Sequence, residues 1–210
     1  MELTNINGNK IDVVYHGKPF ESVEKTENID YLPQRYILFV GQRAKYKNFV
    51  SFISAISKIL LNDENLHLVC AGGFDFSHTE REIICSLNLT NKVLYTGIES
   101  EAKLITLYKN AICFVFPSLY EGFGFPILEA FQCGCPLVCS NNSSFPEVAG
   151  DAALYFDPYD TESIKNAINK VLLDENSRHD MIQKGILQAE KFSWEKTTKQ
   201  TKEVYEKVLG

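Results

Sequence analysis

A regular alternation of short apolar runs with helical patterns constrains this chain most strongly. Six mostly apolar runs have the length of strands buried on both faces of a sheet. They occupy residues 36–40, 66–70, 92–96, 111–116, 136–139 and 153–156. Between them, apolar residues recur every three or four positions, as in Phe49, Phe52 and Ile56, which is the period of an amphipathic helix. Strands that alternate with helices predict an α/β fold: a Rossmann-like parallel six-stranded sheet with helices on both faces.

Other segments flank this core. Residues 11–15 predict a further short strand, and residues 18–34, with their scattered acids, predict an exposed linker. Ser144 and Glu147 have the spacing of a capping box that opens a short helix. Three helices are expected to close the chain. Their predicted ranges are 164–172, 181–189 and 193–209.

Composition excludes several classes of protein. With 210 residues, 45% of them hydrophobic, the chain can bury one full core. Its net charge of -6 and lack of a basic run argue against nucleic-acid binding. The six cysteines, which lack zinc-type spacing, are interpreted as small buried hydrophobes. Without a signal peptide or a long apolar span, a cytoplasmic location is expected, with a peripheral place at the inner face of the membrane left open.

The stretch after residues 111–116 predicts an anion site. Pro117 ends the strand, and Gly122 and Gly124 can adopt backbone angles closed to other residues, which lets a ligand approach the main chain. Pro126 suits the first turn of a following helix. The N–H groups of the next residues, Ile127 and Leu128, are expected to be free and to point outward at the positive end of the helix dipole. Phosphates bind at such helix starts.

Two carboxylates bracket this loop. Glu121 lies within it, and Glu129 lies about one turn into the helix. Near a bound sugar, Glu121 could accept hydrogen bonds from hydroxyl groups; otherwise it is a solvated loop acid. Glu129 could equally be an acid that the helix dipole favours in the first turn.

Cations follow the run at residues 36–40. Gly41 starts this loop, and Arg43, Lys45 and Lys47 come next. Because ligands bind outside the carboxyl ends of parallel strands, these side chains are expected to face the same rim as the loop after residues 111–116. Together the two loops could hold a diphosphate, although solvated loop charges are the simpler interpretation of the cations alone.

The motif itself resembles a known family. Residues 117–130 read PS-x-x-EGFG-x-P-x-x-E-A, and they continue into FQCGCPLV at 131–138 and FPEVAGDAA at 145–153. This sequence is similar to the donor-binding, C-terminal domain of retaining GT-B glycosyltransferases of the family-four type, over roughly residues 9–208. The resemblance implies the C-terminal half of a GT-B fold. It also implies transfer of a hexosyl group from a nucleotide-diphosphate sugar to an acceptor hydroxyl, with retention.

The resemblance also implies roles for individual residues. Arg43 and Lys47 match a basic pair that binds the diphosphate, and Lys45 could replace one of them. Glu121 would contact the donor hexose, and Glu129 would bind the ribose hydroxyls. The further donor contacts are expected at Gly41, Gly122, Phe123, Gly124, Ile127 and Leu128. No cofactor is expected, and no metal either, because no D-x-D motif is present to chelate the diphosphate.

Domain organisation and partners follow from the same resemblance. Residues 1–34 would be an interdomain linker, 35–192 the donor-binding domain, and 193–210 a helix that packs back towards an N-terminal domain absent from this chain. That domain would bind a saccharide or lipid-linked acceptor, so the chain alone is expected to be inactive. The tail around Trp194 and Tyr205 resembles bacterial mannosyltransferases of surface polysaccharide synthesis, which favours GDP-mannose as donor ahead of UDP-hexoses.

Two alternatives stay open at this point. One is a nucleotide-sugar 2-epimerase of the same architecture, and the other is a non-catalytic nucleotide-binding or scaffold domain. Paired carboxylates also occur in glycoside hydrolases. That class is rejected because Glu129 lies inside a phosphate-binding helix start, which a hydrolase does not need.

Overall fold

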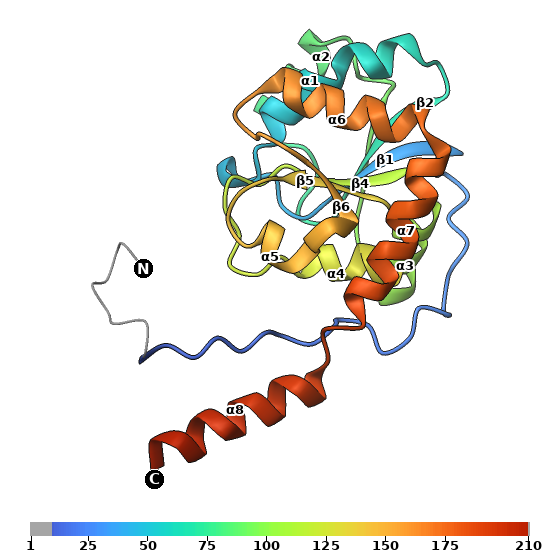
Figure 1. The fold of residues 1–210 in the computed structure, drawn as a ribbon. Coiled ribbons are helices and arrows are strands. Elements are labelled where there is room, and N and C mark those ends of the chain that lie inside the picture. The colour runs from blue at the N-terminus through green and yellow to red at the C-terminus, as the bar shows by residue number, and fades with distance from the viewer. Residues whose placement is uncertain (1–9, 210) are drawn as a thin grey trace.

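The computed structural model describes residues 10–209 and contains one parallel sheet (Figure 1). The strands are β1 (Arg35–Val40), β2 (Leu66–Ala71), β3 (Val93–Thr96), β4 (Cys113–Phe116), β5 (Leu137–Ser140) and β6 (Ala153–Phe156). They lie in the order β3-β2-β1-β4-β5-β6, and every neighbouring pair is parallel. The predicted Rossmann-like six-stranded sheet is therefore confirmed.

Helices cover both faces of this sheet (Figure 1). They are α1 (Phe49–Asn62), α2 (His78–Ser86), α3 (Glu101–Asn110), α4 (Phe125–Gln132), α5 (Phe145–Ala149), α6 (Thr161–Leu173), α7 (Glu175–Ala189) and α8 (Trp194–Leu209), with short 3-10 turns η2 (Lys45–Lys47) and η3 (Gly150–Ala152). The side chains of β1 alternate between two cores. Leu38 packs on the side of α3, α4 and α5, whereas Ile37 and Phe39 pack on the side of α1 and α6.

The strand order reverses between β1 and β4. These two strands pair directly, Ile37 with Cys113 and Leu38 with Phe114. The loops at their carboxyl ends are therefore neighbours, and the Leu119 N–H donates a 2.7 Å hydrogen bond to the Tyr46 carbonyl. In sheets of this type, ligands bind at such a reversal point.

Residues 11–15 do not form the predicted strand. They are extended but pair with no strand of the sheet, and polar side chains hold them instead. The Tyr15 carbonyl accepts a 2.7 Å hydrogen bond from Thr197 in α8, and the Tyr15 hydroxyl donates to Glu147. An apolar alternation specifies a strand only where a sheet edge is available to pair with it.

The predicted exposed linker at residues 18–34 is partly buried, which corrects that expectation. Phe20 is 4% exposed and belongs to the core on the α3 and α4 side. Its N–H and carbonyl both bond the Gln132 side chain, at 3.1 and 2.7 Å. Thr106 of α3 bonds the backbone of Glu27 in the same way. The segment is thus tied to α3 and α4 by paired hydrogen bonds.

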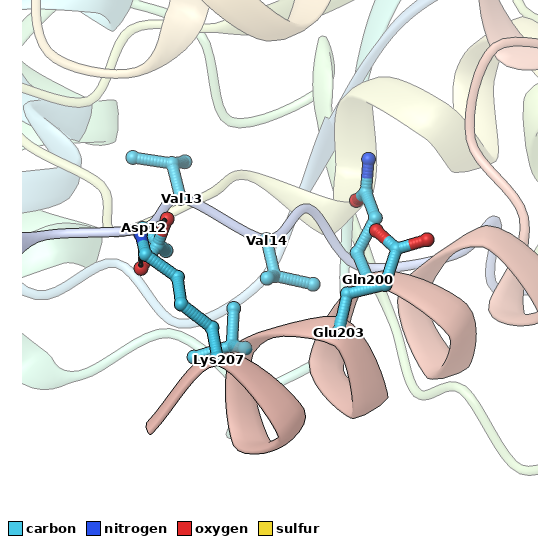
Figure 2. Close-up of a pocket in the computed structure, with 7 residues that line it drawn as sticks. Asp12, Val13, Val14, Gln200, Glu203 and Lys207 are labelled. Carbon is cyan, nitrogen blue, oxygen red and sulfur yellow. Dashed lines mark hydrogen bonds and ion pairs between the residues drawn. The ribbon is translucent and has the colours of Figure 1, made fainter. Parts of the chain in front are cut away.

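Helix α8 stands apart from the layers of the domain (Figure 1), and it has no buried residue. It runs beside residues 12–14, where Lys207 forms a 3.0 Å ion pair with Asp12. Figure 2 shows the hollow of about 310 Å³ between them, with Val13 and Val14 on one side and Gln200 and Glu203 on the other. Among residues 10–209, no helix has the length and apolarity needed to cross a membrane.

Candidate functional site

The glycine loop, residues 117–124, connects β4 to α4. Gly124 precedes the helix with a φ of +92°, a conformation that favours glycine, and Pro126 lies in the first turn. Gly122 does not have a positive φ, so the expectation of special backbone angles holds for Gly124 and is wrong for Gly122. A Cβ atom on Gly122 would meet nothing within 4 Å. Gly122 therefore provides open space at the main chain.

The free amides of this region lie in the loop itself. The Ile127 N–H donates to the Gly124 carbonyl at 2.9 Å, so the prediction that it is free is wrong. The side chains of Ile127 and Leu128 are fully buried. Within residues 10–209, the N–H groups of Gly122 and Gly124 donate to no other group. The Phe123 N–H between them has no acceptor in the described residues either, so an anion would find main-chain donors along residues 122–124.

Lys47 and Glu121 meet across the reversal point. Lys47 Nζ lies 2.7 Å from Glu121 Oε1, and the two side chains are 12% and 16% exposed. Gly41, at the end of β1, has a φ of +111°, and a Cβ there would lie 3.8 Å from Lys47 Nζ. The predicted convergence of the loops after β1 and β4 is confirmed for these three residues.

Arg43 is held elsewhere. Its Nε lies 2.9 Å from Glu80 Oε1 at the start of α2, and its guanidinium carbon lies 4.7 Å from the centre of the Phe76 ring. It also donates to the Phe74 carbonyl, and its side chain is only 4% exposed. The neighbouring Lys45 is exposed. Sequence spacing did not reveal the Glu80 partner, because it belongs to a separate helix.

Glu129 is anchored by a residue that the sequence did not single out. The buried Tyr108 hydroxyl of α3 donates a 2.8 Å hydrogen bond to Glu129 Oε2. Burial raises the pKa of the Glu129 carboxyl, while Tyr108 and the positive charge of Lys47 partly oppose this. Burial likewise raises the pKa of Tyr108 well above its usual value. Because a buried tyrosine hydroxyl needs a hydrogen-bond partner, Tyr108 was the sequence feature that could have predicted a polar contact here.

The turn after β5 contacts the glycine loop through side chains. Ser144 does not cap α5, so the predicted capping box with Glu147 is wrong. Its Oγ donates instead to the carbonyls of Glu121 and Phe123, each at 3.1 Å. Glu147 accepts from Tyr15. The run of Asn and Ser residues at 141–144 directly follows a strand next to β4, and it could have predicted these side-chain contacts.

This arrangement can bind a polar anionic ligand. One cation, the free amides of residues 122–124 and two carboxylates lie at the reversal point of a parallel sheet. The cation and the amides suit phosphate oxygens, and the carboxylates suit hydroxyl groups. Across residues 10–209, no three His, Cys, Asp or Glu side chains are grouped so that they could hold a metal ion.

Comparison with known families decides the identity. The family "Glycosyl transferases group 1" matches residues 22–188. This chain belongs to the group 1 glycosyltransferases. The matched range contains the whole sheet and both loops of the reversal point.

The curated relatives of this glycosyltransferase include a mannosyltransferase. The chain is 35% identical over 191 residues to O-antigen chain mannosyltransferase B of Escherichia coli, covering 89% of this chain and 50% of the relative. It therefore spans about half of that protein's length. A glycosyltransferase structure from Rickettsia africae superposes with a TM-score of 0.82 at 18% identity, over 97% of this chain and 59% of that one.

A solved single domain matches as well. The C-terminal domain of the group 1 protein LpcC from Francisella tularensis has a TM-score of 0.65 at 18% identity. The match covers 81% of this chain and 96% of that domain. At this level of identity the likeness concerns the fold, which is that of a GT-B glycosyltransferase half.

Proposed function

We propose that this glycosyltransferase chain is the C-terminal, donor-binding domain of a retaining hexosyltransferase. The observation that carries the proposal is the contact of Lys47 with Glu121 at the β1–β4 reversal point, beside the free amides of Gly122 and Gly124. A nucleotide-diphosphate sugar presents phosphates and hydroxyl groups together, and this site offers a matching partner for each.

The diphosphate is bound by Lys47 and the loop amides. Lys47 exchanges Glu121 for the phosphate oxygens when the donor enters. Gly41 and Gly122 leave room for the ligand next to the main chain, since a Cβ on Gly122 would meet no atom within 4 Å. Phe123, between the amides of Gly122 and Gly124, sets their spacing. Arg43 acts indirectly, because Glu80 and Phe76 already hold its guanidinium.

The two carboxylates bind the two sugars of the donor. Glu121, released from Lys47, accepts hydrogen bonds from the hydroxyls of the transferred hexose. Glu129 accepts them from the ribose, and Tyr108 orients it from the opposite side. The two glutamates are separated by seven residues, from the middle of the loop to the body of α4, so they can contact opposite ends of one nucleotide sugar.

Transfer proceeds on one face of the sugar. The bond between the anomeric carbon and the diphosphate oxygen breaks, and the acceptor oxygen forms the new bond from the same side. The acceptor proton passes to the departing diphosphate oxygen. Lys47 and the amides stabilise the negative charge that grows there, which is the type of contribution that lowers barriers most. The domain needs no metal for this, because Lys47 supplies the positive charge.

Mannose from GDP-mannose is the proposed hexosyl group, with UDP-hexoses as the next choice. The relative named above as an O-antigen chain mannosyltransferase supports mannose and a role in cell-surface polysaccharide synthesis. The acceptor is then a saccharide or a lipid-linked saccharide, and the enzyme works in the cytoplasm, at the inner face of the membrane when the acceptor is lipid-linked.

An N-terminal domain binds the acceptor in this proposal. The surface formed by residues 12–14 and α8 suits contact with it, because Val13 is 65% exposed beside α8 (Figure 2). Val208 of α8 is 77% exposed. Residues 1–34 then link the two domains, and residues 193–210 return towards the first one. Exposed apolar side chains grouped on one surface mark sites of protein contact.

Calorimetry with GDP, UDP and ADP tests the proposal. The chain is expected to bind one of the three, at millimolar affinity or better, and Glu121→Gln is expected to weaken binding of the nucleotide sugar more than that of the diphosphate. Failure of all three nucleotides to bind would contradict the assignment. Equal effects of Glu121→Gln on both ligands would remove Glu121 from the sugar contact.

A further inference from the structure

Side chains of the turn after β5 hold the backbone of the glycine loop. Asn142 Nδ2 donates to the Leu119 carbonyl at 2.9 Å, and Ser143 Oγ donates to the Glu121 carbonyl at 2.7 Å. Ser143 Oγ also accepts from the Glu121 N–H at 3.2 Å. Ser144 Oγ lies 3.1 Å from both the Glu121 and the Phe123 carbonyls. Three consecutive side chains thus hold the carbonyls of three alternate residues in the loop.

Because of peptide geometry, this contact also fixes the direction in which the loop N–H groups point. In a planar trans peptide unit, the carbonyl of one residue and the N–H of the next point in opposite directions. No cis peptide occurs among the described residues. When the carbonyls of Glu121 and Phe123 point towards the β5 turn, the N–H groups of Gly122 and Gly124 must point away from it. Both amides are among those of the loop that donate to no other group within the described residues.

The turn carries two further marks of a functional constraint. Ser143 has a φ of +56°, an unfavourable conformation for a residue other than glycine. Such strain persists where the surrounding structure requires it, and it clusters at functional sites. In addition, Asn142 Oδ1 is buried without a hydrogen-bond partner in the described chain, as is Ser118 Oγ of the glycine loop beside it. Buried polar atoms of this kind are rare in folded proteins.

We propose that Asn142, Ser143 and Ser144 are positioning residues that aim the Gly122 and Gly124 amides at the distal phosphate of the donor. The inference rests on the proposed function, since it assigns these amides to a diphosphate. The three residues do not touch the substrate. They act through the loop, and they also fix the backbone of Glu121 on both its N–H and carbonyl sides.

Paired binding of nucleoside mono- and diphosphates tests this inference. Affinities of this chain for GMP and GDP, or for UMP and UDP if the chain prefers uridine, are measured by calorimetry for wild type, Ser143→Gly, Ser144→Ala and Ser144→Thr. We expect the first two variants to bind the diphosphate roughly tenfold more weakly, because each loses a hydrogen bond that orients a charge-binding amide. Monophosphate affinity should stay within about twofold, since the distal phosphate is absent.

Two variants distinguish a specific loss of diphosphate binding from a loss caused by lower stability. Ser143→Gly relieves the positive φ, so its melting temperature should match or exceed that of the wild type. Ser144→Thr keeps the hydroxyl at a residue with an ordinary φ of −79°, so it should restore diphosphate binding.

The outcomes separate this inference from the proposed function. A selective loss of diphosphate binding with rescue by Ser144→Thr supports the inference. Unchanged diphosphate binding, equal losses for both ligands or no rescue by threonine would overturn it, while the proposed function would stand. A wild-type chain that binds neither diphosphate would overturn both.

Discussion

Under the proposed function, a bound donor separates Lys47 from Glu121, and this exchange is the main event at the scale of single residues. Their 2.7 Å contact joins two mostly buried side chains, so each compensates the charge of the other. A diphosphate gives Lys47 a partner with more negative charge, and a hexose gives Glu121 several hydroxyl donors. The pair is thus a resting arrangement whose two members have separate roles during transfer.

Replacement of Lys47 tests that assignment. In the enzyme that carries both domains, Lys47→Ala should slow transfer about 100-fold, because it removes one preorganised charge at the leaving group. Lys45→Ala is the matched control, since Lys45 lies in the same 3-10 turn but is exposed. Its rate should stay within about twofold. Equal losses for the two variants would show that the general charge of the loop matters, rather than one contact.

From the burial of the Glu129 carboxyl, we predict that its effect on stability depends on pH. Burial raises its pKa in the folded chain, so the folded state holds this proton more tightly than the unfolded state. The ionised carboxylate therefore costs stability, and this cost grows as pH rises from the ordinary glutamate pKa through the raised value. Glu129→Gln should raise the melting temperature at pH 7 to 8, and the gain should disappear near pH 4.

The same variant separates stability from function. Glutamine keeps an acceptor for the Tyr108 hydroxyl but binds ribose hydroxyls less strongly than a carboxylate does. Nucleotide affinity should therefore fall while the melting temperature rises. A melting temperature that falls at every pH would contradict the assigned cost of burying this carboxylate.

At the scale of elements, we expect the two glycines of the glycine loop to have different roles: Gly124 is needed for the fold and Gly122 for ligand binding. Gly124→Ala should lower the free energy of unfolding by about 2 kcal/mol, because φ is +92° there and the new Cβ would lie 3.1 Å from Ile127 Cδ1. Gly122→Ala should change it by less than about 0.5 kcal/mol but weaken diphosphate binding about tenfold. Urea unfolding and calorimetry on both variants check this. Undiminished diphosphate binding by Gly122→Ala would contradict a ligand contact at this position.

Arg43 links the loop after β1 to the start of α2. Arg43→Ala should reduce the free energy of unfolding by about 3 kcal/mol, because it leaves Glu80 mostly buried without its cation. Arg35→Ala is a suitable control, since its pair with Asp63 is largely exposed and should contribute less than about 1 kcal/mol. Urea unfolding measures both. A small effect on stability with a large effect on diphosphate binding would instead indicate that Arg43 contacts the phosphate.

The sequence predicted the elements better than it predicted their side-chain partners. Apolar period and length were sufficient to predict β1 to β6, and the central strands β1, β4 and β5 are almost entirely buried. Residues 11–15 have a strand-like pattern but no strand to pair with, which sequence alone cannot show. The sequence predicted that the loops after β1 and β4 face the same rim, but not the contact of Lys47 with Glu121. The contacts of Arg43 with Glu80 and of Tyr108 with Glu129 depend on how separate helices pack.

At the scale of the whole molecule, we propose that the chain is a donor-binding domain with a surface left for a partner. None of the proposed donor-site residues lies in α8, which has no buried residue. We therefore expect this chain alone to bind a nucleoside diphosphate and to transfer no sugar. Calorimetry and a radiolabelled transfer assay on the same sample measure the two properties. Sugar transfer by the chain alone would contradict the proposed need for an acceptor domain.

A structure of this chain with the nucleoside diphosphate that it binds most tightly tests the central claim most directly. We predict that Lys47 leaves Glu121 and that the distal phosphate lies within hydrogen-bond distance of Lys47 Nζ and of the Gly122 and Gly124 N–H groups. A diphosphate bound at another edge of the sheet, with the ion pair of Lys47 and Glu121 intact, would contradict it.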